Sequence, residues 1–543
     1  MRRMNGPQRR RRRAGLLTGG LAGTLLIGTG AWAAEPPRPD EGNAKQIITE
    51  RCSTCHERQA DGSLHRIDHV RKTPEGWTMT LFRMNQIHSA NLSPEDSRAL
   101  VAYLSARQGL APEETAPYRY ILERLPAVVE TPIADGDLSV MCARCHSAAR
   151  FGLQRRDADE WKRLANFHLG QFPSIEYSLQ GRDRKWWEIA STQTPQVLGQ
   201  KFPFKTKEWA DWQQAAKPDL AGVWAVTGHR PGLGRYGGTA TVAVERDGYS
   251  VRYDLTDAGG KPLSGTGKAL VYTGYEWRGT ATLGGQEVRE VFAASKDGQS
   301  LSGRWFLPDH DEVGATVTAV RTGTAPTILG FSQEHVKTGT SARVTVWGSG
   351  LDGGPVDFGP GVTVKTLSQS ATAAVVEVAA AANAAPGART VSVGKAKGGG
   401  FTVYAALDSV LVEPAFTIAR VGGNGGATPP VSAQFEAIGY LNGPDGKPGT
   451  ADDIRVGALP AAWTLEPFNE AAKLMEDVKF AGTIGPSGLF APALAGPNPQ
   501  RAFGTNNIGD LKVVATVKDG AATLTGDGRL ISTVQRWNDP PIR

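Results

Sequence analysis

The spacing of hydrophobic and polar residues changes near Pro218. Before it, apolar residues recur at intervals of three and four, as in Trp77, Leu81 and Met84, which predicts amphipathic helices. After it, short runs alternate apolar and polar residues between turn pairs such as Asp247-Gly248, which predicts antiparallel strands. The sequence therefore predicts a multidomain protein with an all-α first part and all-β domains behind it.

Eight alternating runs follow Pro218 with no helical segment between them. Consecutive strands joined by short turns predict an up-and-down antiparallel β-barrel over residues 218–323. Nothing in the sequence points to a ligand for this barrel, so we expect side chains to fill it. The expected strands are 222–228, 239–245, 249–255, 267–273, 277–283, 287–293, 301–307 and 315–321.

Two more β-rich segments complete the chain. Residues 324–407 contain alternating runs separated by Gly and Pro, which is typical of an immunoglobulin-like sandwich without the Cys pair of antibody domains. Residues 408–543 predict a second immunoglobulin-like or β-rich C-terminal domain. Its hairpin at 442–453 carries carboxylates that could bind calcium, but their oxygens are too few and too irregular for a known calcium loop.

Length and composition agree with several globular domains. A chain of 543 residues exceeds what one hydrophobic core serves. Hydrophobic residues make up 40% and charged residues 21%, which excludes a disordered chain.

The first 33 residues change the meaning of the net charge. The chain has a formal charge of +6, but residues 1–33 hold seven Arg and no acidic residue, so the remainder carries −1. A basic start, an apolar stretch at 14–30 and Ala31-Trp32-Ala33 predict a signal peptide cleaved before Ala34, with an uncleaved anchor as the alternative. We therefore expect a periplasmic protein with no membrane span and no affinity for nucleic acid. The Arg run leaves both Sec and twin-arginine export open.

All four Cys residues lie in two motifs of the form Cys-X-X-Cys-His. In such a motif the two thiols bond to the vinyl groups of a haem, and the His is the proximal iron ligand. A redox disulfide or a zinc site is the alternative, but the 90-residue offset from Cys52 to Cys142 exceeds the spacing of zinc sites. The sequence predicts two c-type haems in cytochrome repeats at 34–125 and 126–217. The covalent residues are Cys52, Cys55, Cys142 and Cys145, and the proximal ligands are His56 and His146.

The distal iron ligands are predicted from an internal repeat. Aligning Trp77 with Trp161 places Met84 opposite His168, each seven residues further on. Seven residues make about two helical turns, so each candidate ligand shares a helix face with its Trp. We therefore expect Met84 to ligate the first iron and His168 the second.

Other candidate ligands lie close to these positions. His88 follows Met84 by one helical turn and is the main rival at the first site, whereas Met79 lies on another face of that helix. His65 and His69 belong to a polar stretch that we interpret as a solvated loop. No other His occurs in the 60 residues after His146, which favours His168 at the second site.

Three stretches carry a specific resemblance: RKTPEGWTMTLFRM (71–84), FHLGQFPSIEY (167–177) and GRDRKWWEIA (181–190). With the order of the domains, they resemble the α subunit of quinohemoprotein amine dehydrogenase. The resemblance implies a periplasmic heterotrimer that oxidises primary amines, with a tryptophylquinone on a small subunit and a β-propeller subunit beside it. It also implies that this chain passes electrons to a soluble copper protein or cytochrome c.

Two functional classes stay open, with a cell-surface binding protein as a weaker third. The first is an electron-transfer subunit without catalytic residues of its own, because a Cys-linked quinone cannot form on a chain whose Cys residues all bind haem. The second is a free-standing dihaem enzyme such as a peroxidase, which needs an open iron site. Met ligation raises the potential of a haem. We therefore expect electrons to pass from the partner's quinone to the second site and then to the first.

Overall fold

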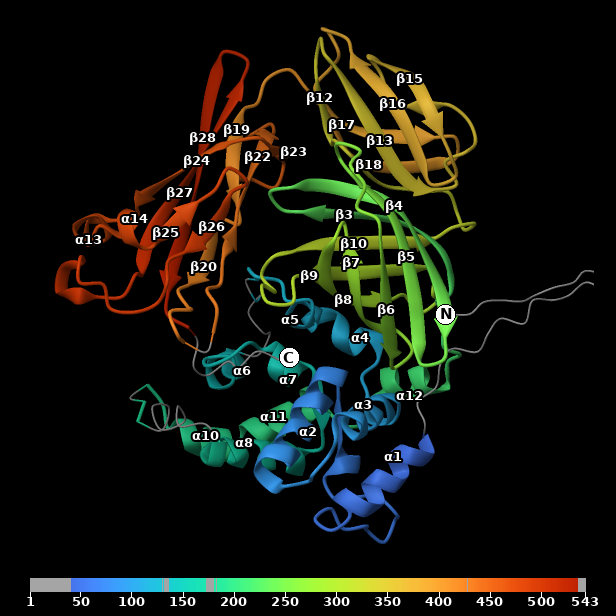
Figure 1. Ribbon diagram of the computed structural model, residues 1–543, viewed down its shortest axis with the longest axis vertical. Coiled ribbons are helices and arrows are strands. Elements are labelled where there is room, and N and C mark those ends of the chain that lie inside the picture. The colour runs from blue at the N-terminus through green and yellow to red at the C-terminus, as the bar shows by residue number, and fades with distance from the viewer. Residues whose placement is uncertain are drawn as a thin grey trace, which may run out of the picture. The chain divides into compact units, whose positions relative to one another are not determined.

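The computed structural model describes residues 41–128, 130, 136–171, 180–181, 183–426 and 428–535. The predicted signal peptide lies outside these residues. A helical domain comes first and is followed by a closed barrel and further β sheets, which confirms the predicted fold class (Figure 1).

The first repeat is built from helices with well-formed N-termini. The Thr73 hydroxyl accepts the N–H of Gly76, and Ser93 and Asp96 form a reciprocal capping box. These caps fix the starts of two 15-residue helices, each with Pro at its first position. The helices are α1 (Glu41–Ile47), α2 (Pro74–His88), α3 (Pro94–Gln108), α4 (Pro112–Thr115) and α5 (Arg119–Leu122), with a π-helical turn at Ile48–Cys52.

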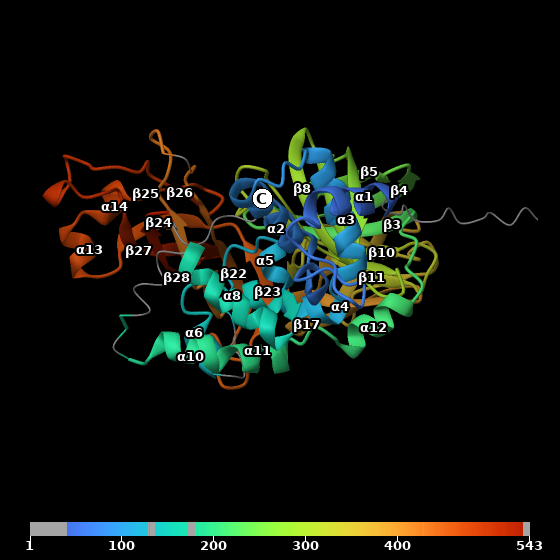
Figure 2. The ribbon, with the colours of Figure 1, turned by 90° about the horizontal axis from the view of Figure 1, so that it is seen from below.

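The second repeat has a corresponding long helix, α8 (Ala158–Gln171), which packs against α10 (Trp186–Thr192) and α11 (Thr194–Lys201). Figure 2 shows α8, α10 and α11 as one group and α1, α2 and α3 as another. The remaining helices of this repeat are α6 (Gly136–Met141), α7 (Ala149–Gly152) and α12 (Lys207–Gln214).

A two-stranded antiparallel sheet joins the repeats: β1 (Val70–Lys72) leads into α2, and β2 (Gln154–Arg156) leads into α8. The two tryptophans have matching environments. Trp77 donates its indole N–H to the Gln108 carbonyl, and Trp161 donates to the Phe202 carbonyl. A cation covers each ring, Lys72 over Trp77 and Arg156 over Trp161. The structure therefore supports the alignment of Trp77 with Trp161.

Eight antiparallel strands close into a barrel in which each strand pairs with the next and β10 pairs with β3. Nearly every predicted strand lies inside an observed one. The largest difference is at β4, which starts at Gly234 because it pairs with β3 as far as Arg230. At Gly237 the Trp347 ring lies 2.4 Å from where a Cβ would stand. The strands are β3 (Gly222–Arg230), β4 (Gly234–Glu245), β5 (Gly248–Asp257), β6 (Gly265–Tyr272), β7 (Glu276–Leu283), β8 (Gln286–Ala294), β9 (Ser300–Phe306) and β10 (Gly314–Arg321).

Buried aromatic side chains occupy the barrel core, including Trp224, Trp277 and Trp305. The Glu290 carboxylate is also buried; it accepts hydrogen bonds from the Tyr253 hydroxyl (2.6 Å) and the Trp277 indole (3.0 Å). Side chains fill the barrel, as expected.

The third domain is a pair of four-stranded sheets around a common apolar core. One sheet has the order β11-β13-β16-β15 and the other β12-β18-β17-β14. The strands are β11 (Thr327–Phe331), β12 (His335–Lys337), β13 (Ser341–Ser349), β14 (Val356–Asp357), β15 (Val362–Gln369), β16 (Ala373–Ala380), β17 (Gly387–Val393) and β18 (Ala396–Tyr404).

Within 408–426 and 428–535, the described part of the C-terminal domain, there are three sheets and two short α-helices, α13 (Glu470–Leu474) and α14 (Asp477–Phe480). In its 442–453 hairpin the Asp453 carboxylate accepts the N–H groups of Gly443 and Gly449. No metal-binding group of three His, Cys, Asp or Glu occurs among the described residues. The strands are β19 (Ser409–Glu413), β20 (Phe416–Arg420), β21 (Ala433–Gln434), β22 (Glu436–Leu441), β23 (Ile454–Leu459), β24 (Ala462–Pro467), β25 (Gly482–Ile484), β26 (Leu489–Pro492), β27 (Gly509–Asp519) and β28 (Ala522–Thr533).

Candidate haem-binding site

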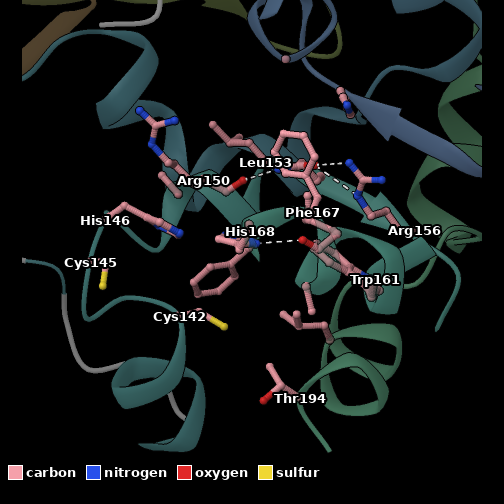
Figure 3. Close-up of a pocket in the computed structure, with 18 of the residues that line it drawn as sticks. Cys142, Cys145, His146, Arg150, Leu153, Arg156, Trp161, Phe167, His168 and Thr194 are labelled. Carbon is pink, nitrogen blue, oxygen red and sulfur yellow. Dashed lines mark hydrogen bonds between the residues drawn. The ribbon is translucent and has the colours of Figure 1, made fainter. Parts of the chain in front are cut away.

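The second Cys-X-X-Cys-His motif opens onto a cavity in the helical domain. Cys142, Cys145 and His146 line it from the segment after α6, and His168 lines it from α8 (Figure 3). Trp186 of α10 completes part of the wall and donates its indole N–H to the Met141 carbonyl (3.2 Å). The structure thus brings together the four residues that the sequence predicts for the second haem.

Hydrogen bonds orient both imidazoles in this cavity. Nδ1 of His146 lies 2.9 Å from the Ser147 carbonyl, and Nδ1 of His168 lies 2.8 Å from the Leu164 carbonyl. A carbonyl only accepts, so each Nδ1 carries the proton and each Nε2 carries the lone pair that can ligate iron. Burial lowers the pKa of His168, which favours the neutral, ligating form.

The first motif has the same arrangement at its proximal His. Nδ1 of His56 lies 3.0 Å from the His65 carbonyl, which fixes its tautomer in the same way. The segment that carries His65 is not the solvated loop expected from its polar sequence. Leu64 and Val70 are buried, and Nε2 of His65 accepts from Arg163 of α8 at 2.8 Å. This segment therefore positions His56.

The candidates for the sixth ligand of the first site differ in exposure and in the face of α2 on which they lie. Trp77 and Leu81 pack in the same apolar cluster as Cys52. Met84 is half-buried one turn after Leu81, whereas His88 is exposed in the last turn. Met79 lines the cavity of the second motif instead. The helix thus presents different faces to the two motifs, and Met84 as ligand of the first iron stays a prediction.

Several cavity residues of the second motif come from the first repeat, which sequence reasoning missed. Lys72, Gly76, Met79 and Arg83 of β1 and α2 all line this cavity. The pairing of β1 with β2 brings part of the first repeat to the second motif. Strands of three residues are too short for their hydrophobic pattern to be recognised in the sequence. The one usable signal was the alignment itself, which sets Lys72 opposite Arg156 and predicts equivalent roles for them.

The chemistry of the second cavity fits a covalently bound haem. Two thiols with two residues between them, an adjacent imidazole and a second imidazole from a different helix are the donors that such a group needs. The charged lining residues in the described part of the chain are all cationic, namely Lys72, Arg83, Arg150 and Arg156. Cationic lining suits a ligand with two carboxylates.

Fold and site together define a class: a subunit with an N-terminal haem-binding helical domain that carries a barrel and further β domains. Family comparison agrees over most of the chain. Residues 42–209 match the haem-binding domain of the quinohemoprotein amine dehydrogenase α subunit. Residues 217–322, 325–405 and 410–542 match domains II, III and IV of that subunit. The chain belongs to the family of quinohemoprotein amine dehydrogenase α subunits, which confirms the resemblance seen in the sequence.

Other comparisons add little. No curated protein sequence matches the chain. Among solved structures, a de novo designed fluorescence-activating β-barrel has 18% identity over 19% of this chain and 93% of that chain, with a TM-score of 0.16. Three extracellular domains of a mouse clustered protocadherin have 10% identity over 44% of this chain and 76% of that chain, with a TM-score of 0.17. None of the helices among the described residues has the length and apolar composition that crossing a bilayer needs.

Proposed function

We propose that this α subunit is a periplasmic dihaem electron carrier of a primary amine dehydrogenase. It passes electrons from a tryptophylquinone on a small partner subunit, through two c-type haems, to a soluble copper protein or cytochrome c. A β-propeller subunit completes the heterotrimer. The observation that carries the proposal is the convergence of Cys142, Cys145, His146 and His168 on one cavity.

The residues of the chain hold the carriers and set their ligand fields. Each pair of Cys residues attaches one haem: Cys52 and Cys55 the first, Cys142 and Cys145 the second. His56 and His146 supply the proximal nitrogens. Met84 and His168 close the distal positions. With every Cys used in this way, none is left to cross-link a quinone on this chain, so the site of amine oxidation belongs to a partner.

A free-standing dihaem peroxidase is the rival, because it would use the same four Cys residues. Such an enzyme needs an iron position open to peroxide. The His168 imidazole, which the Leu164 carbonyl orients, would occupy that position at the second site, and this supports electron transfer over peroxide chemistry.

The proposal is tested with purified α subunit that carries its haems, alone and in the complex. Primary amine should reduce both haems in the complex and neither haem in the isolated subunit. Steady amine turnover by the isolated subunit would place the active site on this chain and contradict the proposal.

Haem content is tested separately. The pyridine haemochrome assay should give two haems per chain in the wild type and one in Cys52→Ala or Cys142→Ala. Ser53→Ala, between the two Cys residues of the first motif, is the control and should keep both haems.

A further inference from the structure

Two cations in the wall of the second cavity, the buried Lys72 and the half-buried Arg83, lack an anionic partner among the described residues. Lys72 is 5% exposed; its Nζ donates to the Thr80 hydroxyl (2.6 Å) and lies over the Trp77 ring. The Arg83 guanidinium lies over the Phe167 ring, 4.9 Å from its centroid. Neither side chain forms an ion pair with Asp or Glu within the ranges that the structure describes.

The surroundings make these charges costly. Burial holds the pKa of Lys72 well below its ordinary value, and Arg156 and Arg83 add repulsion. Burial also lowers the pKa of Arg83. The buried carboxylate of Glu160, which partly offsets the lowered pKa of Lys72, already pairs with Arg66, Arg156 and Arg163. A buried charge without a partner is strongly destabilising. The described residues of the cavity wall supply no anion that would balance Lys72 and Arg83.

A haem supplies that missing negative charge through its two propionates. An electron added to the iron makes the group more negative, so nearby cations stabilise the reduced form. Water is largely excluded around Lys72, so the effect is stronger there than at the surface.

We propose that Lys72 and Arg83 of the first repeat are positioning residues for the haem of the second repeat, which balance its negative charge and raise its reduction potential. This inference rests on the proposed haem attachment at Cys142 and Cys145. It adds a determinant of potential that comes from the other repeat and does not depend on the axial ligands.

The two sites differ in this determinant. The repeat alignment sets Lys72 opposite Arg156, but Arg156 lines the second cavity as well, and it sets Arg83 opposite Phe167, which has no charge. The Arg156 guanidinium lies 3.5 Å from Glu160, whereas Lys72 has no such partner. The extra positive charge therefore falls on the second site, where a bis-imidazole ligand set lowers the potential.

Lys72 and Arg83 also pack against aromatic rings, so a purely structural role is the competing explanation. A cation over an aromatic ring stabilises a fold whether or not a haem is bound. The reduction potential separates the two roles, because lost packing alone does not change the charge near the iron.

The experiment is a spectroelectrochemical titration of the haem-loaded α subunit, with haem content measured on the same samples. Arg83→Gln and Lys72→Met should each lower the ratio of reduced to oxidised second haem about tenfold at a fixed electrode potential, which is about 59 mV for one electron. The ratio of reduced to oxidised first haem should change by less than about twofold, because the effect of a more distant charge is screened.

Two controls keep the test specific. Lys72→Arg retains the charge and should retain the potential. Arg107→Gln removes a guanidinium that also lies over an aromatic ring, Tyr103 at 5.3 Å, but does not line the cavity, so the second haem should not shift.

Each outcome has a defined meaning. An unshifted second haem in Arg83→Gln, with both haems present, would overturn the inference and leave the proposed function intact. A wild-type chain without a haem at Cys142 and Cys145 would instead refute the proposed function. If Lys72→Met does not retain its haems, Arg83→Gln alone decides, because its guanidinium makes no hydrogen bond within the described part of the chain.

Discussion

Arg71 and Arg155 face each other across β1 and β2, and both bind the carboxylate of Glu114. They are also equivalent in the repeat alignment, since the same 84-residue offset relates Trp77 to Trp161. An approximate two-fold axis therefore passes between them. The distances to Glu114 are 2.8 Å from Arg71 and 2.9 Å from Arg155, and all three side chains are buried.

This arrangement predicts that Glu114→Gln destabilises the helical domain. Two buried guanidinium groups would lose their shared anion, and breaking a buried pair costs about 3–5 kcal/mol. Urea unfolding followed by haem absorbance measures the loss. Glu113→Gln is the matched control: Glu113 is exposed in the same helix and should cost less than about 1 kcal/mol. Equal losses in both variants would show that Glu114 does not hold the repeats together.

The alternating strands of the barrel could be predicted because each one is written locally in the sequence. The turn predicted at Asp247-Gly248, for example, lies at Arg246-Asp247, and Gly248 is the first residue of β5. The contact of Arg71 with Arg155 could not be predicted in this way. It depends on two three-residue strands meeting across the repeats, and short strands have no periodicity to recognise.

Some residues of the candidate site can likewise be predicted from local sequence, and others cannot. Cys142, Cys145 and His146 follow from a contiguous motif, and His168 follows from the alignment on Trp161. Lys72 and Arg83 follow from neither, because their place in the second cavity results from how α2 packs between the two motifs. The alignment relates equivalent residues, whereas these two residues serve the opposite repeat.

The two faces of α2 predict which methionine ligates the first iron. Met84→Leu should abolish the near-infrared charge-transfer absorption of ferric Met-ligated haem, because no other thioether takes its place on that face. Met79→Leu should retain this absorption, since Met79 lines the second cavity. Ferric absorption spectra of the two haem-loaded variants provide the measurement. If only Met79→Leu lost this absorption, Met79 and not Met84 would be the ligand of the first iron.

Glu276 of β7 predicts a pH-dependent stability. Burial raises the pKa of Glu276 to about 7, from an ordinary value of 4.5, although Arg278 and the Thr273 hydroxyl oppose the shift. The unfolded chain then releases this proton at lower pH than the folded chain. The contribution of Glu276 to stability is therefore greatest below about pH 4.5, falls as pH rises toward 7 and is constant above that.

Glu276→Gln removes this dependence. At pH 8 the variant should be more stable than the wild type by up to about 3 kcal/mol, because it does not bury a charge, while at pH 5 the two should be similar. Melting temperatures measured from pH 5 to pH 8 provide the comparison. Glu287→Gln, an exposed position on β8, should follow the wild type at every pH. A constant difference between Glu276→Gln and the wild type across this range would contradict the assignment.

The last prediction concerns the order of the two reduction potentials. A thioether donates weakly and favours ferrous iron, whereas a second imidazole favours ferric iron. The haem at His56 and Met84 should therefore have the higher reduction potential, and the haem at His146 and His168 the lower. Lys72 and Arg83 should reduce the difference between the two potentials. Electrons should then pass from the partner's quinone to the second site, to the first, and on to the soluble acceptor. Met84→His should lower the reduction potential of the first haem in a redox titration and slow the reduction of the soluble acceptor. Substrate should still reduce the partner's quinone at the wild-type rate. A wild-type titration in which the Met-ligated haem has the lower potential would reverse the order, and it would mean that the cations around the second cavity outweigh the axial ligands.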